Sequence, residues 1–167
     1  MKGRDIALTK TSINKKKEVV DIRHVVKYKR VVEDARPPLV TDGNAGFDFY
    51  AIEDTDIQGR GVKVRTGLKL AIPEGYHIKL FMRSSMGANT NIRMSNCVGI
   101  IDSSYRGEVM GIFDNDYRVQ TIKKGDRFMQ GILESNIGIE FEEAEELGDT
   151  NRGEGGFGST GGVIVGR

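Results

Sequence analysis

The clearest structural pattern in the chain lies at residues 61–73, which read GVKVRTGLKLAIP. Apolar side chains recur there at every second position, with basic residues between them: Val62, Val64, Leu68, Leu70 and Ile72 against Lys63, Arg65 and Lys69. A period of two is typical of a strand with one buried and one solvated face. Similar alternation recurs at residues 76–82 and 109–113. The sequence therefore predicts several strands.

Glycine is unusually frequent between these stretches. The chain holds 22 glycines and three prolines among 167 residues, about twice the usual glycine share of roughly 7%. That content predicts many turns, or backbone that approaches a ligand closely. Only residues 85–89 and 140–147 have a pattern compatible with a helix. Because helices do not alternate with strands, we expect an all-β sandwich or barrel with a single core, and not a Rossmann or P-loop architecture.

The composition excludes several classes of protein. The 25 Lys and Arg residues nearly balance 24 Asp and Glu residues, a net charge of +1, so we expect neither nucleic-acid nor membrane binding. The single cysteine, Cys97, excludes an internal disulfide and a cysteine-based metal cluster. It favours a reducing, cytoplasmic location, or the host cytoplasm if the chain is viral. No apolar run approaches the roughly 18 residues of a membrane span, and no secretory signal follows Met1.

Three regions are predicted along the chain. Residues 1–22 form a basic N-terminal extension, either a solvated arm or, less favoured, a nuclear-targeting or nucleic-acid patch. Residues 23–148 form the β domain. Residues 149–167 form a flexible glycine-rich arm with little that could build a core.

The glycine-rich arm resembles two nucleotide-binding motifs but fits neither. Gly153, Gly155 and Gly158 fit the dinucleotide pattern G-x-G-x-x-G, but only nine residues follow, too few for the required βαβ unit. The segment also resembles a Walker A loop, but it lacks the lysine. What remains is a backbone that can cradle phosphates, with Arg152 as a cation and Phe157 as a face for base stacking. The alternative is a disordered tail.

Together with four upstream segments, this arm resembles the five ordered motifs of the trimeric dUTPase family. The upstream segments are residues 45–51 (AGFDFYA), 83–87 (RSSMG), 99–108 (GIIDSSYRGE) and 125–130 (GDRFMQ). Their order and spacing match the family from about Val25 to Gly161, which is most of the chain. Any one motif is weak evidence, whereas five in order are specific.

The resemblance implies hydrolysis of dUTP to dUMP and pyrophosphate by attack of water on the α-phosphorus. Asp102 would be the general base that activates this water, a normal task for a carboxylate within hydrogen-bond reach. Gln130 would help to position this water or one bound to a phosphate. Judged without the motifs, Asp102 could simply open a turn and Gln130 could be an exposed strand amide.

The third motif and the residues before it would bind the nucleoside. In the family a hairpin pairs with uracil through backbone groups, here those of Gly99, Ile100 and Ile101, and through an asparagine, here Asn96. Such a donor and acceptor pattern is mismatched to cytosine. Tyr105 would lie against the deoxyribose and exclude a 2′-hydroxyl, and Met110 would line the same pocket. Locally, Asn96 could be an ordinary turn residue and Tyr105 a half-buried strand aromatic.

The remaining motifs would hold the phosphates. The resemblance assigns phosphate contacts to Arg83, Ser84 and Ser85, although family members usually carry glycine at the position of Ser85. Asp48 and Arg127 resemble a supporting acid–base pair. In the arm, the resemblance assigns substrate contacts to a further group: Arg152, Gly156, Phe157, Gly158, Ser159 and Thr160.

The resemblance also implies a cofactor and an assembly. Mg²⁺ would be held mainly by the triphosphate and by waters, because the sequence shows no His, Asp and Glu cluster of metal-ligand spacing. The implied fold is a jelly-roll-like β barrel that forms a homotrimer with shared active sites and an exchanged C-terminal strand or tail. The resemblance itself implies no protein partner; if the chain binds one, we expect the contact at the N-terminal extension.

Two alternatives stay open from the sequence. A dCTP deaminase has a motif similar to Arg83-Ser84-Ser85, but that family places an arginine three residues after the second serine, where this chain has Ala88. It also uses a catalytic glutamate on a later strand. The second alternative is a regulatory dUTPase-like module that binds a protein partner.

Overall fold

The structure, a computed structural model, describes residues 23–156. The extension predicted at residues 1–22 and the contacts predicted for Phe157, Gly158, Ser159 and Thr160 therefore lie outside the described residues. The chain divides into two compact units, residues 1–136 and residues 137–167. The boundaries predicted from the sequence, a domain at 23–148 and an arm at 149–167, stay a prediction.

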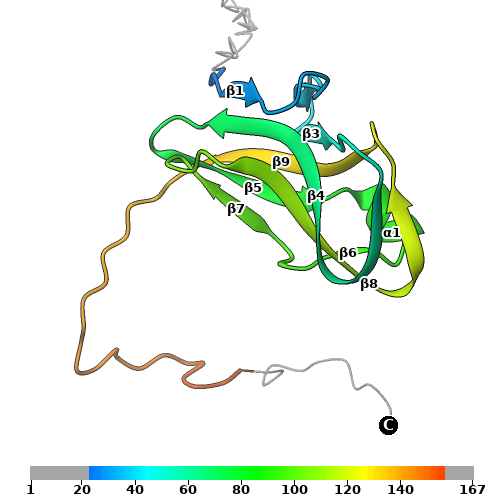
Figure 1. Ribbon diagram of the computed structural model, residues 1–167. Coiled ribbons are helices and arrows are strands. Elements are labelled where there is room, and N and C mark those ends of the chain that lie inside the picture. Colours follow the sequence, from blue (N-terminus) through cyan, green and yellow to red (C-terminus); the bar gives the residue numbers. More distant parts are fainter. Residues whose placement is uncertain (1–22, 157–167) are drawn as a thin grey trace, which may run out of the picture. The chain divides into compact units, whose positions relative to one another are not determined.

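The described part of the first unit consists of nine strands and one short helix (Figure 1). In chain order these are β1 (Lys27–Arg30), β2 (Leu39–Val40), β3 (Phe47–Tyr50), β4 (Thr55–Ala71), β5 (Tyr76–Met82), α1 (Ser84–Asn89), β6 (Arg93–Met94), β7 (Gly99–Asp102), β8 (Glu108–Ile122) and β9 (Arg127–Ser135).

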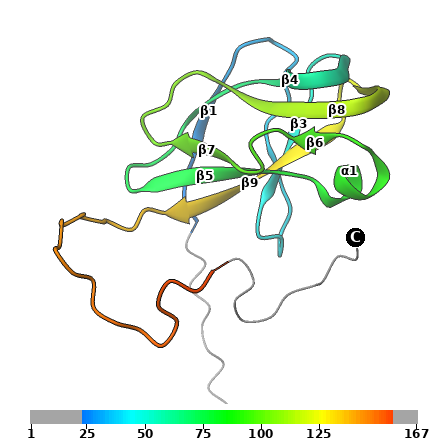
Figure 2. The same cartoon turned by 90° about the horizontal axis from the view of Figure 1, so that it is seen from below.

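The strands form two antiparallel sheets. One has the order β1-β4-β8-β6, and the other has the order β2-β3-β9-β5-β7. Figure 2 shows β4 and β8 of the first sheet lying over β5 and β9 of the second. The all-β class predicted from the sequence is therefore confirmed, as two facing sheets.

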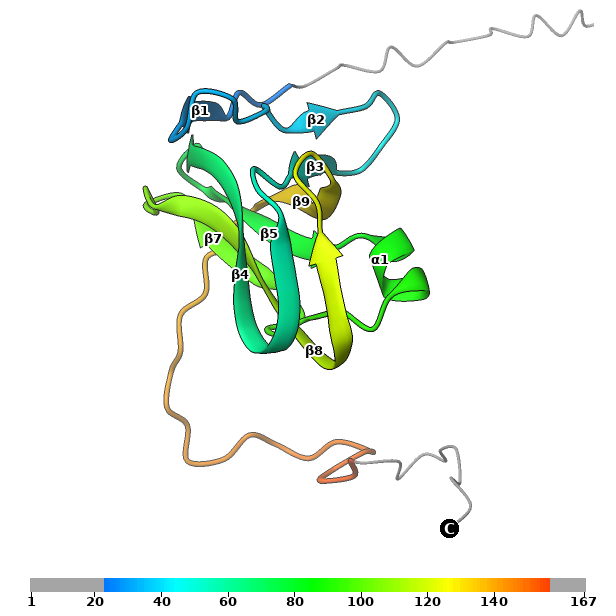
Figure 3. The same cartoon turned by 45° about the vertical axis from the view of Figure 1, so that its right-hand side comes forward.

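The strand pattern at residues 61–73 is confirmed and belongs to a longer element. Val64, Leu68 and Leu70 are buried, whereas Lys63 and Lys69 are exposed. The strand β4 is 17 residues long and pairs with the 15-residue β8 along most of its length (Figure 3). Two strands of this length curve around the core only if their pairing is interrupted, and the register shifts at three places.

One of these shifts depends on Gly67. Its φ is +69°, and a Cβ atom there would stand 2.8 Å from the Ala35 Cβ and 2.9 Å from Ile52 Cγ2. Only glycine satisfies both the left-handed backbone and this close approach. The five residues from Arg65 to Lys69 therefore bulge against the three residues from Glu108 to Met110 of β8.

Both sheets contribute to one hydrophobic core. Phe113 of β8 and Phe128 of β9 are fully buried with their rings at 66° and 5.8 Å between centroids. Offset or edge contacts of this kind add about 0.5–1.5 kcal/mol to the burial itself. The other fully buried large side chains come from both sheets and the connections between them: Phe49, Ile57, Leu68, Ile78, Leu80, Ile92, Met129, Val64 and Val109.

Of the two segments whose sequence is compatible with a helix, one is helical. Residues 85–89 lie within α1, which ends where the backbone N–H and the hydroxyl of Thr90 both donate to the Met86 carbonyl, at 3.0 and 2.7 Å. The other candidate segment, residues 140–147, forms no helix: this stretch of the second unit has no helical residues and is fully exposed. It contains five glutamates and no lysine or arginine, so like charges at i+3 and i+4 oppose the helix and no buried face offsets them. No helix in residues 23–156 is long and apolar enough to span a membrane.

Candidate functional site

A cavity of about 260 Å³ lies between β7 and the strands β6 and β8 of the other sheet. We call it the β7 pocket; its lining residues are Leu80, Met94, Asn96, Gly99, Ile100, Ile101, Asp102, Tyr105, Met110 and Ile112. Seven of these were predicted from the sequence: Asn96, Gly99, Ile100, Ile101, Asp102, Tyr105 and Met110. The volume is slightly below the usual range for ligand pockets of about 300–1,000 Å³, so the pocket suits part of a nucleotide and not all of it.

The backbone of β7 is available to a ligand. This strand is the last in its sheet and pairs only with β5. Its second edge has no strand partner among residues 23–156, so N–H and C=O groups on that edge are free of the ladder. Because Gly99 to Asp102 line the pocket, these groups offer a row of donors and acceptors to a planar polar ligand.

The loop that carries Asn96 is held on both sides. Ser95 donates its backbone N–H to the Ile112 carbonyl at 2.9 Å and its hydroxyl to Asp114 at 2.6 Å. The hydrogen bonds from the Ser95 hydroxyl and from the Gly61 N–H hold the pKa of Asp114 below its ordinary value of 3.8. Beyond Asn96, Cys97 has a φ of +57°, and the Val98 N–H donates to the Asn96 carbonyl at 2.5 Å. A non-glycine residue in this region is strained, which is frequent next to functional groups.

Asp102 and Tyr105 lie at the end of β7. Asp102 is exposed. Its backbone carbonyl accepts a hydrogen bond from the Tyr105 N–H at 3.1 Å, which closes a turn. Tyr105 is 44% exposed, and its hydroxyl donates to the Glu108 carbonyl at 3.1 Å. The ring therefore lies back across Gly107, where a Cβ atom would stand only 2.2 Å from the Tyr105 hydroxyl oxygen.

A second group of predicted residues gathers around Asp48 on β3. Its Oδ2 accepts from Arg127 Nη1 at 3.1 Å, and its Oδ1 forms an ion pair with Arg83 Nε at 3.2 Å. Arg83 also donates from Nη1 to the Arg127 carbonyl at 3.2 Å. The predicted pairing of Asp48 with Arg127 is thus present, and it includes Arg83, which the sequence had assigned to phosphate. The Asp48 side chain is only 17% exposed, so it can hold both guanidinium groups in fixed positions.

The other predicted phosphate residues lie beside this group. Ser84 and Ser85 are exposed in the first turn of α1, and Ser85 adopts ordinary helical geometry in place of the family's usual glycine. Gln130 of β9 stands between Asp48 and Phe81 in the ladder and donates to the Met82 carbonyl at 3.5 Å. Cavities of about 610 and 700 Å³ flank the group: Gln130 and Asp48 line the first, and Arg83, Ser85 and Arg127 line the second.

The two groups of residues lie at opposite ends of β5. Asp102 pairs with His77 near the start of that strand, whereas Arg83 follows its last residue, Met82. Six residues at about 3.3 Å each separate them by about 20 Å along the strand. All three general views show β7 and α1 on opposite sides of the domain (Figures 1, 2 and 3).

The second unit contains two of the predicted residues in its described part. Arg152 donates from Nε to the Gly155 carbonyl at 2.7 Å, and Gly156 follows this turn. The Gly153 N–H donates to both the carbonyl and the hydroxyl of Thr150. Upstream, Ile137, Ile139 and Phe141 alternate with other residues and are at least 76% exposed.

The sequence missed three residues that line the β7 pocket. Leu80, Met94 and Ile112 come from β5, β6 and β8, and the sequence gave them no role beyond strand and core positions. The alternation at residues 76–82 and 109–113 places two of them in strands, but only the pairing of those strands brings them to β7.

The described residues offer no ready-made metal site. No group of three or more His, Cys, Asp or Glu residues converges within residues 23–156. Both oxygens of Asp48 are engaged by arginines, so this carboxylate has little capacity left for a cation.

The family model and the similar proteins found by comparison agree with one another. A family model described as dUTPase matches residues 34–161. The deoxyuridine 5′-triphosphate nucleotidohydrolase of Helicobacter pylori (strain ATCC 700392 / 26695) is 39% identical over 130 residues, covering 75% of this chain and 88% of the relative. The enzyme of the same name from Fusobacterium nucleatum is 43% identical over 129 residues, covering 75% and 88%.

Solved structures share the fold. A mutant dUTPase of Staphylococcus bacteriophage 80alpha with dUpNHpp has a TM-score of 0.75 at 24% identity, covering 83% of this chain and 99% of the other. A mutant dUTPase of phage phi11 of S. aureus, described with the coordination of a structural Mg(II) ion, has a TM-score of 0.67 at 21% identity, covering 74% and 99%.

Proposed function

The chain belongs to the dUTPase family and is a dUTP diphosphatase, and from that premise we propose which of its residues bind dUTP and which act on it. The observation that carries the proposal is the β7 pocket, which gathers Asn96, the edge of β7, Asp102 and Tyr105 around one cavity. Base recognition, sugar recognition and a candidate general base thereby lie within one short segment.

The β7 pocket binds uracil and deoxyribose. The free backbone edge of β7 and the Asn96 amide supply donors and acceptors for the polar edge of uracil. Met94, Met110 and Ile112 provide apolar walls for the two faces of the ring. Cytosine reverses part of the donor and acceptor pattern and would leave buried polar groups unpaired, which costs about 1–3 kcal/mol for each group. The ring of Tyr105 closes the sugar end.

Asp102 activates the water that attacks the α-phosphorus. The residue is exposed at the end of β7, so a water can reach its carboxylate, and it lies in the same turn as Tyr105. The α-phosphate is attached to the sugar through C5′ and O5′ alone, so a base next to the sugar is well placed for in-line attack. Gln130 positions the phosphates or the water from the other group of residues.

The complete site requires more than one copy of the chain. Phosphates that start at the sugar cannot reach Arg83 and Ser84 of the same chain, because those residues are about 20 Å from Asp102 along β5. A second copy that places its α1 end against the β7 pocket removes this gap. We therefore infer a homotrimer of jelly-roll-like subunits with shared active sites.

Two further features support assembly. Ile100, which is 53% exposed, lies in one ladder row with Lys79 and Ile132 on the outer face of the five-stranded sheet. In the second unit, the exposed alternation of Ile137, Ile139 and Phe141 is typical of a strand that would pair with another sheet. The glycine-rich arm beyond it, with Arg152, would close over the phosphates of a neighbouring site.

Magnesium fits this arrangement as a partner of the substrate. The absence of a carboxylate cluster in residues 23–156 is compatible with Mg²⁺, which keeps several waters and binds through substrate phosphates. Among the residues that line the β7 pocket, Asp102 has the only carboxylate. When bound, Mg²⁺ would neutralise part of the triphosphate charge, and the residues of this chain would orient the phosphates and the water.

The test measures pyrophosphate and ammonia released from dUTP and from dCTP by the purified chain. We expect pyrophosphate from dUTP, no ammonia, and little turnover of dCTP. Ammonia released from dCTP would assign a deaminase activity, and no product from either nucleotide would favour a regulatory module.

A further inference from the structure

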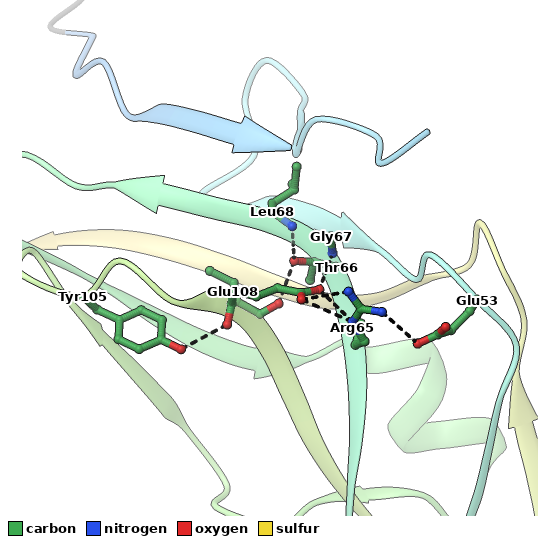
Figure 4. Close-up of polar contacts among 8 residues, drawn as sticks. Glu53, Arg65, Thr66, Gly67, Leu68, Tyr105 and Glu108 are labelled. Atoms are coloured by element: carbon green, nitrogen blue, oxygen red, sulfur yellow. Dashed lines mark hydrogen bonds and ion pairs between the residues drawn. The ribbon is translucent and has the colours of Figure 1, made fainter. Parts of the chain in front are cut away.

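The carboxylate of Glu108 fills the bulge of β4 next to the sugar end of the β7 pocket. The register passes from Arg65 opposite Met110 to Lys69 opposite Glu108, so four steps on β4 face two on β8. The Glu108 side chain, 9% exposed, supplies acceptors in this gap. Oε1 accepts from the Gly67 N–H at 2.8 Å, and the carboxylate accepts from Arg65 Nε at 3.2 Å and Nη2 at 3.0 Å (Figure 4).

These contacts fix the backbone at the start of β8. A nearly buried carboxylate is stable only when it is paired and hydrogen-bonded, so its position is well determined. The next residue is also tied to β4, because the buried Thr66 hydroxyl donates to the Val109 carbonyl at 2.6 Å. The hydrogen bonds from Arg65 to Glu108 raise the pKa of the guanidinium, which is protonated at all ordinary pH values in any case.

The backbone fixed in this way is the one that holds Tyr105. The Tyr105 hydroxyl donates to the carbonyl of Glu108 itself, and Figure 4 shows the ring reaching across to that residue. Without this bond a tyrosine that is 44% exposed would be free to rotate away from the pocket. Rejecting a single additional hydroxyl on a ribose requires the ring to stay within a fraction of an ångström of one place.

We propose that Glu108 is a positioning residue for sugar selection: its side chain, anchored by Arg65 and the Gly67 N–H, fixes the carbonyl that holds the Tyr105 ring against the deoxyribose. The proposal rests on the function proposed above for Tyr105. It assigns the discrimination between dUTP and UTP to a chain of contacts from β4 through Glu108 to the ring, and not to Tyr105 alone.

The test is a double-mutant cycle of Glu108 and Tyr105. The quantity measured in each variant is selectivity, defined as the ratio of kcat/KM for dUTP to kcat/KM for UTP. Glu108→Ala should lower this ratio roughly three- to tenfold, the range of one ordinary hydrogen bond. Tyr105→Phe keeps the ring but removes the donor. In that background Glu108→Ala should change the ratio less than about twofold, because the link through the hydroxyl is already absent.

Two controls separate positioning from general stability. Asn115→Ala removes buried hydrogen bonds to the Ile57 and Arg118 carbonyls, away from this bulge, so it should lower the melting temperature without changing the ratio. Glu53→Gln removes the more distant partner of Arg65, at 3.8 Å, and should change neither quantity. If Glu108→Ala does not yield folded protein, Glu108→Gln takes its place in the same cycle.

The outcomes are distinguishable. Suppose that Tyr105→Ala loses selectivity, as the function proposed for Tyr105 requires. The positioning role of Glu108 would then be overturned if Glu108→Ala left the ratio unchanged, or if it lowered the ratio equally in the parent and in the Tyr105→Phe background. If Tyr105→Ala itself kept the parent ratio, the function proposed for Tyr105 would fail, and the role of Glu108 would fail with it.

Discussion

Replacing Gly107 with alanine displaces the Tyr105 ring without changing the chemistry of any residue that contacts substrate. The φ of Gly107 lies outside the left-handed region, so alanine fits the backbone. Its Cβ atom would stand 2.2 Å from the Tyr105 hydroxyl oxygen, 2.4 Å from Cζ and 2.9 Å from Cε2. Since nonbonded carbon atoms keep about 3.5–4.0 Å apart, the ring must move by about 1 Å or more.

A displacement of this size should be visible mainly in catalysis. The lost bond from Tyr105 to the Glu108 carbonyl costs about 0.5–1.5 kcal/mol of stability, whereas a 1 Å misplacement beside the reacting group can cost about 10²-fold in rate. We expect kcat/KM for dUTP to fall by roughly 10- to 100-fold, with a smaller fall for UTP. The assay is pyrophosphate release with both nucleotides, beside a urea unfolding curve.

The matched control is the same substitution in a Tyr105→Ala background, where the new methyl group meets no ring and should have little further effect. Parent-like kinetics and selectivity for Gly107→Ala would refute the reasoning, because they would show that the observed ring position is not the one used with substrate.

Three other predictions concern single carboxylates. Asp102→Asn should bind the non-hydrolysable α,β-imido analogue of dUTP nearly as well as the parent in calorimetry, but turn over dUTP roughly 10²–10⁴-fold more slowly; near-normal turnover would exclude it as the general base. Asp48→Asn should lower the free energy of unfolding by about 1–3 kcal/mol and also lower kcat/KM, because Arg83 and Arg127 both lose the carboxylate with which they form ion pairs. An unchanged urea midpoint would contradict this prediction. The pKa of Asp114 is depressed in the folded state, so its contribution is present above its ordinary value of 3.8 and is lost as pH falls through the lower folded value. The melting temperature of Asp114→Asn should therefore lie below that of the parent at pH 6 and approach it in acid, and a constant difference would refute the assignment.

The sequence predicted the features that depend on local pattern. Alternation at residues 61–73 marks β4 correctly because the buried and solvated faces of a strand differ by one residue. The motif residues Asn96, Asp102 and Tyr105 meet in one pocket because they lie within a short segment that folds back on itself. Their roles in catalysis stay predictions.

Features that depend on how the strands pair, or on the charges around a segment, could not be predicted from the sequence. The anchoring of Glu108 in the β4 bulge requires knowledge that four steps of one strand face two of another. Arg83 was assigned to phosphate, and its additional pairing with Asp48 arises only because β3 and β5 pair with opposite edges of β9. Residues 140–147, whose pattern is compatible with a helix, do not form one, because their apolar side chains are exposed and their glutamates repel one another.

The central claim is that the pocket of one copy works with the phosphate-binding residues of another, and subunit mixing tests it directly. Each variant, Asp102→Asn and Arg83→Ala, is first shown to be nearly inactive alone. Each is also shown to form an assembly with the same molar mass in solution as the parent. They are then mixed in equal amounts under conditions that exchange subunits, with exchange confirmed by mass spectrometry. If each site combines Asp102 from one chain with Arg83 from a neighbour, random mixing in a symmetric ring should restore about one quarter of the parent's turnover. If both residues act within one chain, mixed assemblies contain no intact site, and activity that stays at the level of the two separate variants would contradict the account.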